Sequence, residues 1–110
     1  MPREFVLLKA PQLEGLNRNE TVFFFSLGPL EDHGPHLPVG LDFFEARHLA
    51  QAAAERLERE MPGWTGIVMP AAPLGIDGNS GFLSLRVRAH VLRDYLVDVC
   101  RGLHAQGFKH

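Results

Sequence analysis

The sequence predicts an α/β layered fold with a mostly parallel sheet, and three observations support this prediction. Residues 22–25 form an unbroken β-prone apolar run, Val-Phe-Phe-Phe, which is typical of a strand buried on both faces. A second short strand is predicted at residues 66–69. Each predicted strand is followed by a Pro- and Gly-rich loop and then by a helical pattern, and this repeated order is that of layered α/β proteins.

The first half of the chain contains two predicted helices. A short helix is expected near residues 11–16, and residues 27–41, with three Pro and three Gly, are expected to form a loop. Asp42, with Glu45 three residues later, is expected to cap the next helix in a capping box. Pro62 and Gly63 end that helix. Its predicted apolar face consists of Phe43, Ala46, Leu49, Ala50, Ala53, Leu57 and Met61.

The second half of the chain contains one predicted loop and one predicted helix. The loop covers residues 70–81, and the helix runs from about residue 88 to residue 106 without a convincing N-cap. Gly107 is a suitable residue to follow its C-terminus. The apolar stripe of this helix is predicted to comprise Leu92, Tyr95 or Leu96, Val99 and Leu103.

Composition indicates one small globular domain and excludes several classes of protein. Of 110 residues, 45% are hydrophobic and 22% charged, and the formal net charge of −2 gives no basic surface for nucleic acid. We find no apolar run of the ~20 residues that cross a bilayer, so no membrane partner is expected. The single cysteine, Cys100, excludes an internal disulfide framework. We therefore expect a cytoplasmic protein.

A cluster of ionisable side chains follows the first predicted strand. In an extended segment Glu31 and His33 share one face while Asp32 points away, and Asp42 can turn back toward them from the helix start. Ligands of parallel sheets bind beyond the carboxyl ends of the strands, where this loop lies. Carboxylates and imidazole suit Zn²⁺, Mn²⁺ or Fe²⁺. A polar loop with a capping aspartate is the alternative, and spacing alone does not decide between them.

The stretch "GPLEDHGPHLPVGLD" resembles the signature of the creatininase family, G-x-x-E-x-H-G-P-H-L-P followed by an Asp. The resemblance implies a three-layer α/β/α fold and a metal-dependent hydrolase acting on C–N bonds of amides and cyclic amides. It makes Glu31 a ligand of one metal, His33 a ligand of the other and Asp42 the bridging carboxylate. His36 matches a family histidine that is not usually counted as a ligand. We place His36 and Asp77 as possible residues beside the metals or in the substrate pocket, although Asp77 is also an ordinary turn residue.

The rest of the chain resembles the family more loosely. "VMPAAPLG", "FLSL" and "LRDYLVDVCRGLHAQGF" are similar to a strand with its loop, a helix-opening segment and a helix. Two features depart from the family pattern: "GIDGNSGFLSL" lacks a His and the tetrapeptide Phe-Pro-Gly-Thr, and no Asn-Gly-His-x-x-Asn segment follows "GFKH". We therefore interpret residues 1–110 as the N-terminal part of a single creatininase-like domain, incomplete at the C-terminus.

The resemblance implies an amidohydrolase that cleaves a small-molecule amide with a metal-activated water. A complete site would hold two divalent ions, Zn²⁺ or Mn²⁺, with Fe²⁺ also compatible. Because this chain lacks the second half of that site, we expect the 110-residue chain alone to be inactive. A homo-oligomer is expected, since creatininase itself is a hexamer. The alternative is a non-catalytic, truncated subunit or interaction module with a vestigial metal site. Neither the substrate nor the choice of metal can be predicted.

Overall fold

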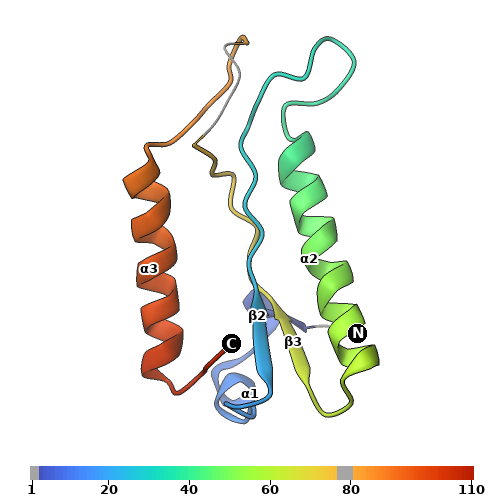
Figure 1. Ribbon diagram of the computed structural model, residues 1–110, viewed down its shortest axis with the longest axis vertical. Helices are drawn as coiled ribbons and strands as arrows, with labels where there is room; N and C mark the ends of the chain where they lie inside the picture. The colour runs from blue at the N-terminus through green and yellow to red at the C-terminus, as the bar shows by residue number, and fades with distance from the viewer. Residues whose placement is uncertain (1–2, 77–80) are drawn as a thin grey trace.

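A computed structural model describes residues 3–76 and 81–110 and shows three layers, with a small sheet between two long helices (Figure 1). All strand pairs are parallel, and the strand order is β1-β3-β2. The predicted α/β/α class is therefore confirmed. The elements in chain order are β1 (Arg3–Glu4), η1 (Phe5–Leu7), α1 (Ala10–Glu14), β2 (Thr21–Phe24), α2 (Leu41–Glu60), β3 (Thr65–Val68) and α3 (Ala89–Ala105).

The apolar run of β2 is explained by the two helices that cover its opposite faces. Phe23 belongs to a core on the α3 side that also contains Ile67 and Phe108, and the partly buried Phe25, Val99 and Leu103 pack against it. Phe24 packs on the α2 side, against Ala50, Ala54 and Val68. Successive side chains of a strand alternate between faces, so a strand covered on both faces needs apolar residues throughout.

Small residues bring α2 close to the sheet. A Cβ added to Gly66 would lie 2.9 Å from the Cβ of Ala54, so β3 and the helix meet without intervening side chains. Ala50 and Ala54 are buried, whereas Leu49 is 60% exposed and Met61 42% exposed. The predicted apolar face was therefore partly wrong, because Leu49, Ala53 and Met61 are exposed and the helix contacts the sheet through Ala50 and Ala54.

The predicted capping box at Asp42 was also wrong. The helix begins at Leu41, its N-cap is Gly40, and no side chain makes a capping hydrogen bond. Asp42 instead lies in the first turn. Its carboxylate is therefore available for contacts outside the helix.

The helix α3 has the predicted bounds within one residue, and it lacks a side-chain N-cap, as expected. Gly107 has φ +90°, which is the left-handed conformation predicted for the residue after the helix. The reversal places the Phe108 ring 4.9 Å from the Phe23 ring and lets the Phe23 N–H donate to the His110 carbonyl oxygen at 3.2 Å. Residues after α3 therefore lie beside the outer edge of β2.

Short elements near the N-terminus complete the described fold. β1, which pairs with β3, has only two residues, Arg3 and Glu4, and carries no apolar pattern that could have predicted it. The helix α1 lies close to its predicted position. No helix in the described ranges is long and apolar enough to cross a membrane.

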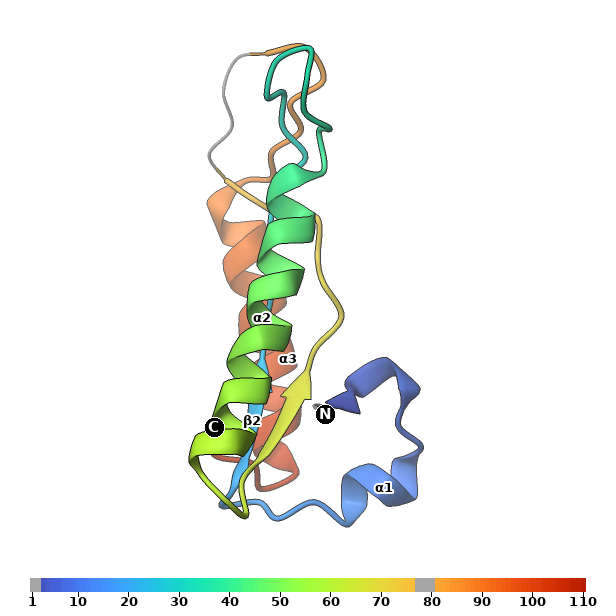
Figure 2. The same cartoon turned by 90° about the vertical axis from the view of Figure 1, so that its right-hand side faces the viewer.

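Two long loops continue past the carboxyl ends of β2 and β3 and extend well beyond the sheet (Figure 2). Backbone pairing ties them together. Leu27 forms a parallel bridge with Ala72, and Leu30 forms an antiparallel bridge with Leu85. The loop after β2 is thus held at two points, and it carries two of the predicted metal ligands, Glu31 and His33.

Candidate metal centre

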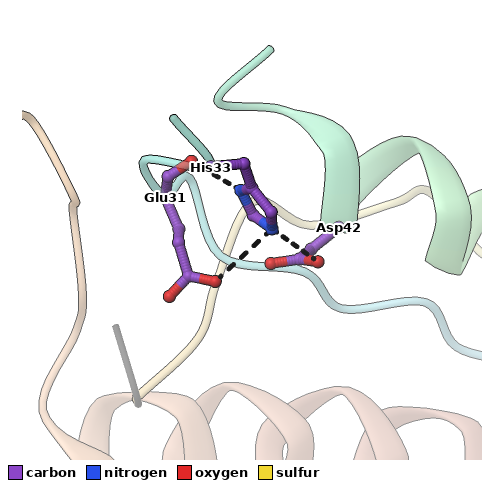
Figure 3. A group of neighbouring side chains, drawn as sticks. All are labelled: Glu31, His33 and Asp42. Carbon is purple, nitrogen blue, oxygen red and sulfur yellow. Dashed lines mark hydrogen bonds and ion pairs between the residues drawn. The ribbon is translucent and has the colours of Figure 1, made fainter. Parts of the chain in front are cut away.

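Three of the predicted site residues converge beyond the carboxyl end of β2. In Figure 3 the His33 ring lies between the carboxylates of Glu31 and Asp42. The His33 Nε2 is 3.7 Å from Glu31 Oε1 and 3.5 Å from Asp42 Oδ1. One ligand atom from each residue lies within 4.8 Å of the other two, and no other His, Cys, Asp or Glu group in the described ranges shows such convergence.

The backbone around Glu31 is held from two sides. The Glu31 N–H donates to the Val39 carbonyl at 2.9 Å, which closes the loop on itself. The Leu85 N–H donates to the Leu30 carbonyl at 2.8 Å, which joins the loop to the one that follows β3. Pairing on both sides fixes where the Glu31 side chain leaves the backbone.

Asp32 lies outside the cluster, as the alternation of side chains predicted. Its backbone N–H donates to Ser84 Oγ at 3.0 Å, and its Oδ1 accepts a hydrogen bond from the Gly34 N–H at 2.7 Å. Gly34 has φ +84°, a conformation that glycine adopts readily. This turn reverses the chain directly after His33.

The orientation of the His33 ring is set by the residue two positions before it. The His33 Nδ1 lies 2.9 Å from the Glu31 carbonyl oxygen, so a neutral ring carries its proton on Nδ1 and donates it there. The lone pair of Nε2 then faces the two carboxylates. Metal-ligating histidines show the same arrangement, in which the other ring nitrogen donates to a carbonyl or carboxylate.

The electrostatics of the cluster favour a positive charge. The pKa of His33 is raised above 6.5, chiefly by the hydrogen bond to the Glu31 carbonyl. Desolvation opposes this shift, and the charges of Asp42 and Glu31 together with a hydrogen bond to Asp42 add to it. A group of carboxylates that stabilises a proton on the ring also favours a cation placed among them.

Asp42 is brought into the cluster by contact between the loop and α2. A Cβ on Gly28 would lie 2.6 Å from the carbonyl carbon and oxygen of Asp42, so the two backbones touch. Asp42 follows the helix N-cap by two residues, and its side chain is 30% exposed. The side chains of Glu31 and His33 are 18% and 20% exposed. The site is therefore shielded in part yet open to a ligand from solvent.

The donor set and its spacing fit a divalent ion. Bond lengths of ~2.0–2.2 Å place neighbouring ligand atoms roughly 3.0–3.5 Å apart around one ion. The two distances from His33 Nε2, 3.5 and 3.7 Å, lie close to that range, and the Glu31 and Asp42 oxygens lie within 4.8 Å of each other. Two carboxylates and one imidazole are ligands that suit Zn²⁺ and Mn²⁺.

The remaining predicted residues lie elsewhere. His36 is exposed, and its ring lies beside Gly34, where an added Cβ would be 3.4 Å from its Nδ1 and Cε1. It is not part of the cluster. Asp77 falls outside the described residues. Ser84 and Gly28 could not be predicted from the sequence, because their contacts with Asp32 and Asp42 depend on how distant segments meet in space.

Comparisons with known proteins identify a family and a similar fold. The chain matches the family model Creatininase, described as creatinine amidohydrolase, over residues 7–110. A similar solved structure is that of a provisionally assigned creatinine amidohydrolase from Bacteroides fragilis NCTC 9343, with a TM-score of 0.73 and 23% sequence identity. The match covers 97% of this chain and 42% of that one, so this chain spans less than half the length of that relative. It shows a shared fold. No curated protein matches the chain.

Proposed function

The chain belongs to the creatininase family, and on that premise we propose that it forms the metal-binding part of an amidohydrolase acting on an amide or cyclic amide. The observation that carries this proposal is the position of His33. Its Nε2 lies within 3.7 Å of a carboxylate on each side, and its Nδ1 is bonded to a backbone carbonyl. A ring held in this way presents a neutral nitrogen ligand between two anionic ones.

Three side chains of this chain would hold the metal ions: Glu31, His33 and Asp42. The bound ion would supply an activated water and polarise the scissile carbonyl. The two carboxylates of this chain balance the charge of a divalent ion, and the hydrogen bond between His33 and Glu31 keeps the ring in the tautomer that can ligate. Zn²⁺ and Mn²⁺ fit these donors, and Fe²⁺ is compatible with them.

A second ion is part of the proposal, with Asp42 as the bridging carboxylate. Three protein ligands divided between two ions leave each ion with at most two donors from these side chains. Catalytic zinc is normally held by three protein ligands. We therefore expect only weak metal binding by the 110-residue chain, and further ligands would have to come from other residues.

Assembly and location are a further part of the proposal. We propose a homo-oligomer in the cytoplasm with a small-molecule amide as substrate. Association is supported by exposed apolar side chains on the two loops: Phe82 is 82% and Leu83 63% exposed on the loop after β3, and Val39 is 47% exposed on the loop after β2. Large exposed apolar side chains that lie together mark contact surfaces.

Metal titration of the purified chain tests the proposal. We expect Zn²⁺ or Mn²⁺ to bind with micromolar affinity in calorimetry, and we expect His33→Ala to abolish the heat signal. His48→Ala is the matched control, because His48 is an exposed histidine on α2 and not in the cluster. The absence of metal binding by the unmodified chain would overturn the proposal. If the chain binds metal but hydrolyses no amide even when any missing metal ligands are supplied, that result would favour the non-catalytic alternative.

A further inference from the structure

The peptide group between Glu31 and Asp32 makes two hydrogen bonds in opposite directions. Its carbonyl oxygen, which belongs to Glu31, lies 2.9 Å from His33 Nδ1. Its N–H, which belongs to Asp32, donates to Ser84 Oγ at 3.0 Å. A trans peptide group is planar, and its C=O and N–H point away from each other. Because the two groups share one rigid plane, fixing the direction of the N–H also fixes the direction of the C=O.

Ser84 is brought to this peptide group by the loop that follows β3. It lies 52 positions after Asp32 in the chain. The next residue, Leu85, forms the antiparallel bridge with Leu30 and donates its N–H to the Leu30 carbonyl at 2.8 Å. Two neighbouring residues of one loop therefore hold two backbone groups of the other. This backbone pairing brings the Ser84 hydroxyl to the Glu31–Asp32 peptide group.

The hydrogen bond at His33 depends on this peptide orientation. If the Glu31–Asp32 peptide rotates, the Glu31 carbonyl turns away from Nδ1 and the ring loses the bond that selects its tautomer. The proton can then move to Nε2, where it would block the lone pair that faces Glu31 and Asp42. The Glu31 N–H is bonded to Val39 on the other side, but that bond holds the preceding peptide group. The Ser84 hydroxyl accepts the hydrogen bond from the peptide group that His33 contacts.

We propose that Ser84 is a positioning residue for the metal centre, which acts on His33 through the Glu31–Asp32 peptide group. Ser84 does not touch the metal or the substrate in this role. The inference rests on the proposed metal function of Glu31, His33 and Asp42. It goes beyond that function because it assigns control of the ligating tautomer to a hydroxyl on a different loop.

Two variants of Ser84 that match each other in shape provide the test. Ser84→Thr keeps the hydroxyl. Ser84→Val has nearly the same shape as the Thr variant but lacks the hydroxyl that accepts the hydrogen bond. Ser84→Ala is a third variant without added bulk, and Arg86→Ala, on an exposed residue of the same loop, is the control. Zn²⁺ titration of the 110-residue protein should give an affinity for the Val and Ala variants about 10- to 100-fold weaker than the unmodified chain, as for other residues that orient metal-bound histidines. The Zn²⁺ affinities of Ser84→Thr and Arg86→Ala should stay within about threefold of that of the unmodified chain.

A second measurement reports the tautomer directly and needs no metal. Long-range ¹H–¹⁵N NMR spectra of the metal-free protein, at a pH where the ring is neutral, should show His33 with its proton on Nδ1 in the unmodified chain and in Ser84→Thr. Ser84→Val should show a mixture of both tautomers. If the Val and Ala variants keep the Nδ1 proton and the full affinity, the inference is wrong. If Ser84→Ala fails to fold, the comparison of Ser84→Thr with Ser84→Val still tests the inference.

The two proposals fail in different ways. Failure of the unmodified chain to bind Zn²⁺ would contradict the proposed function, while the tautomer spectra would still test the part played by Ser84. Normal metal binding that none of the Ser84 variants weakens would contradict the positioning role alone.

Discussion

Gly28 lies against the backbone of Asp42 with no room for a side chain between them. A Cβ on Gly28 would be 2.6 Å from the Asp42 carbonyl carbon and oxygen and from the Phe43 nitrogen. Real Cβ atoms essentially never approach backbone so closely, so one of the two segments would have to move. The contact therefore sets how far α2 stands from the segment that follows β2, and with it the position of the Asp42 carboxylate.

Replacement of Gly28 by Ala should damage both stability and metal binding. The added methyl group pushes the first turn of α2 away, and overpacking of this kind costs about 1–3 kcal/mol. We expect a lower free energy of unfolding in urea and at least a tenfold weaker Zn²⁺ affinity. Gly102→Ala in α3 is the control, because nothing lies within 4 Å of the added Cβ. That change should raise stability by up to ~1 kcal/mol. Equal behaviour of the two variants would contradict the close-contact argument.

Removal of the carboxylate charges of Glu31 and Asp42 should weaken metal binding without changing the shape of these side chains. Glu31→Gln and Asp42→Asn keep the size of each side chain but replace an anionic oxygen ligand with an amide. We expect each to lower Zn²⁺ affinity at least tenfold in calorimetry.

Asp32→Asn is the matched control for these variants. Asp32 lies between the proposed ligands Glu31 and His33 in the sequence. The change removes its negative charge and can keep the Oδ1 acceptor that binds the Gly34 N–H. Its metal affinity should remain within about threefold of the unmodified chain. A loss as large as that of Glu31→Gln would mean that general negative charge, and not ligation by particular residues, attracts the ion.

The sequence predicted those features that depend on local pattern. The run before Ser26 was correctly assigned as a strand covered on both faces, and Gly107 was correctly assigned as the residue after α3. The convergence of Glu31, His33 and Asp42 was expected from a long motif, and the structure brings the three together, whereas their role as metal ligands stays a prediction.

Features that depend on tertiary contact could not be predicted. Asp42 fits a capping pattern, but the helix begins earlier, with Gly40 as its N-cap. The Asp42 carboxylate faces His33 instead. Leu49 fits an apolar helix face, yet the helix is seated on Ala50 and Ala54 because Gly66 permits close approach. The bond between Ser84 and Asp32 joins residues 52 positions apart and has no local signal.

Metal affinity and metal-free stability should respond to pH in opposite directions. The His33 pKa is raised above 6.5 in the folded protein, first by the Glu31 carbonyl and then by the nearby carboxylates. Since a proton on Nε2 competes with a metal, affinity should fall as pH is lowered through this raised pKa. In the metal-free protein, a raised folded-state pKa contributes stability that is fully present below the unfolded value of 6.5 and is lost as pH rises through the folded value.

NMR titration of His33 and urea unfolding across pH 5 to 9 would measure both effects. The His33→Ala variant should lose the part of the stability change that the unmodified chain shows near the His33 midpoint. Glu31→Gln and Asp42→Asn should each lower that midpoint, because each removes a charge that favours the protonated ring. A midpoint at or below 6.5 in the unmodified chain would contradict the electrostatic argument.

Weak packing of α3 leads to a prediction about assembly. None of its residues is fully buried, and an open groove of about 420 Å³ lies beside it, lined mainly by apolar residues that include Phe5, Tyr95 and Leu103. β2 is an edge strand of the sheet, and among the described residues its outer side makes one backbone hydrogen bond, from the Phe23 N–H to the His110 carbonyl oxygen. Edge strands and apolar grooves left open favour association with another chain.

We therefore expect the 110-residue chain to self-associate at micromolar concentrations. Sedimentation velocity should show a sedimentation coefficient that rises with concentration, and amide hydrogen exchange at low concentration should be faster in α3 than in α2, whose Ala50 and Ala54 are buried. Association should slow exchange in α3 if this helix lies at the contact. A monodisperse monomer that unfolds cooperatively with the ~5 kcal/mol or more of an ordinary domain would contradict the prediction. Such stability would show that the half-buried stripe of α3 is enough to hold the helix on the sheet.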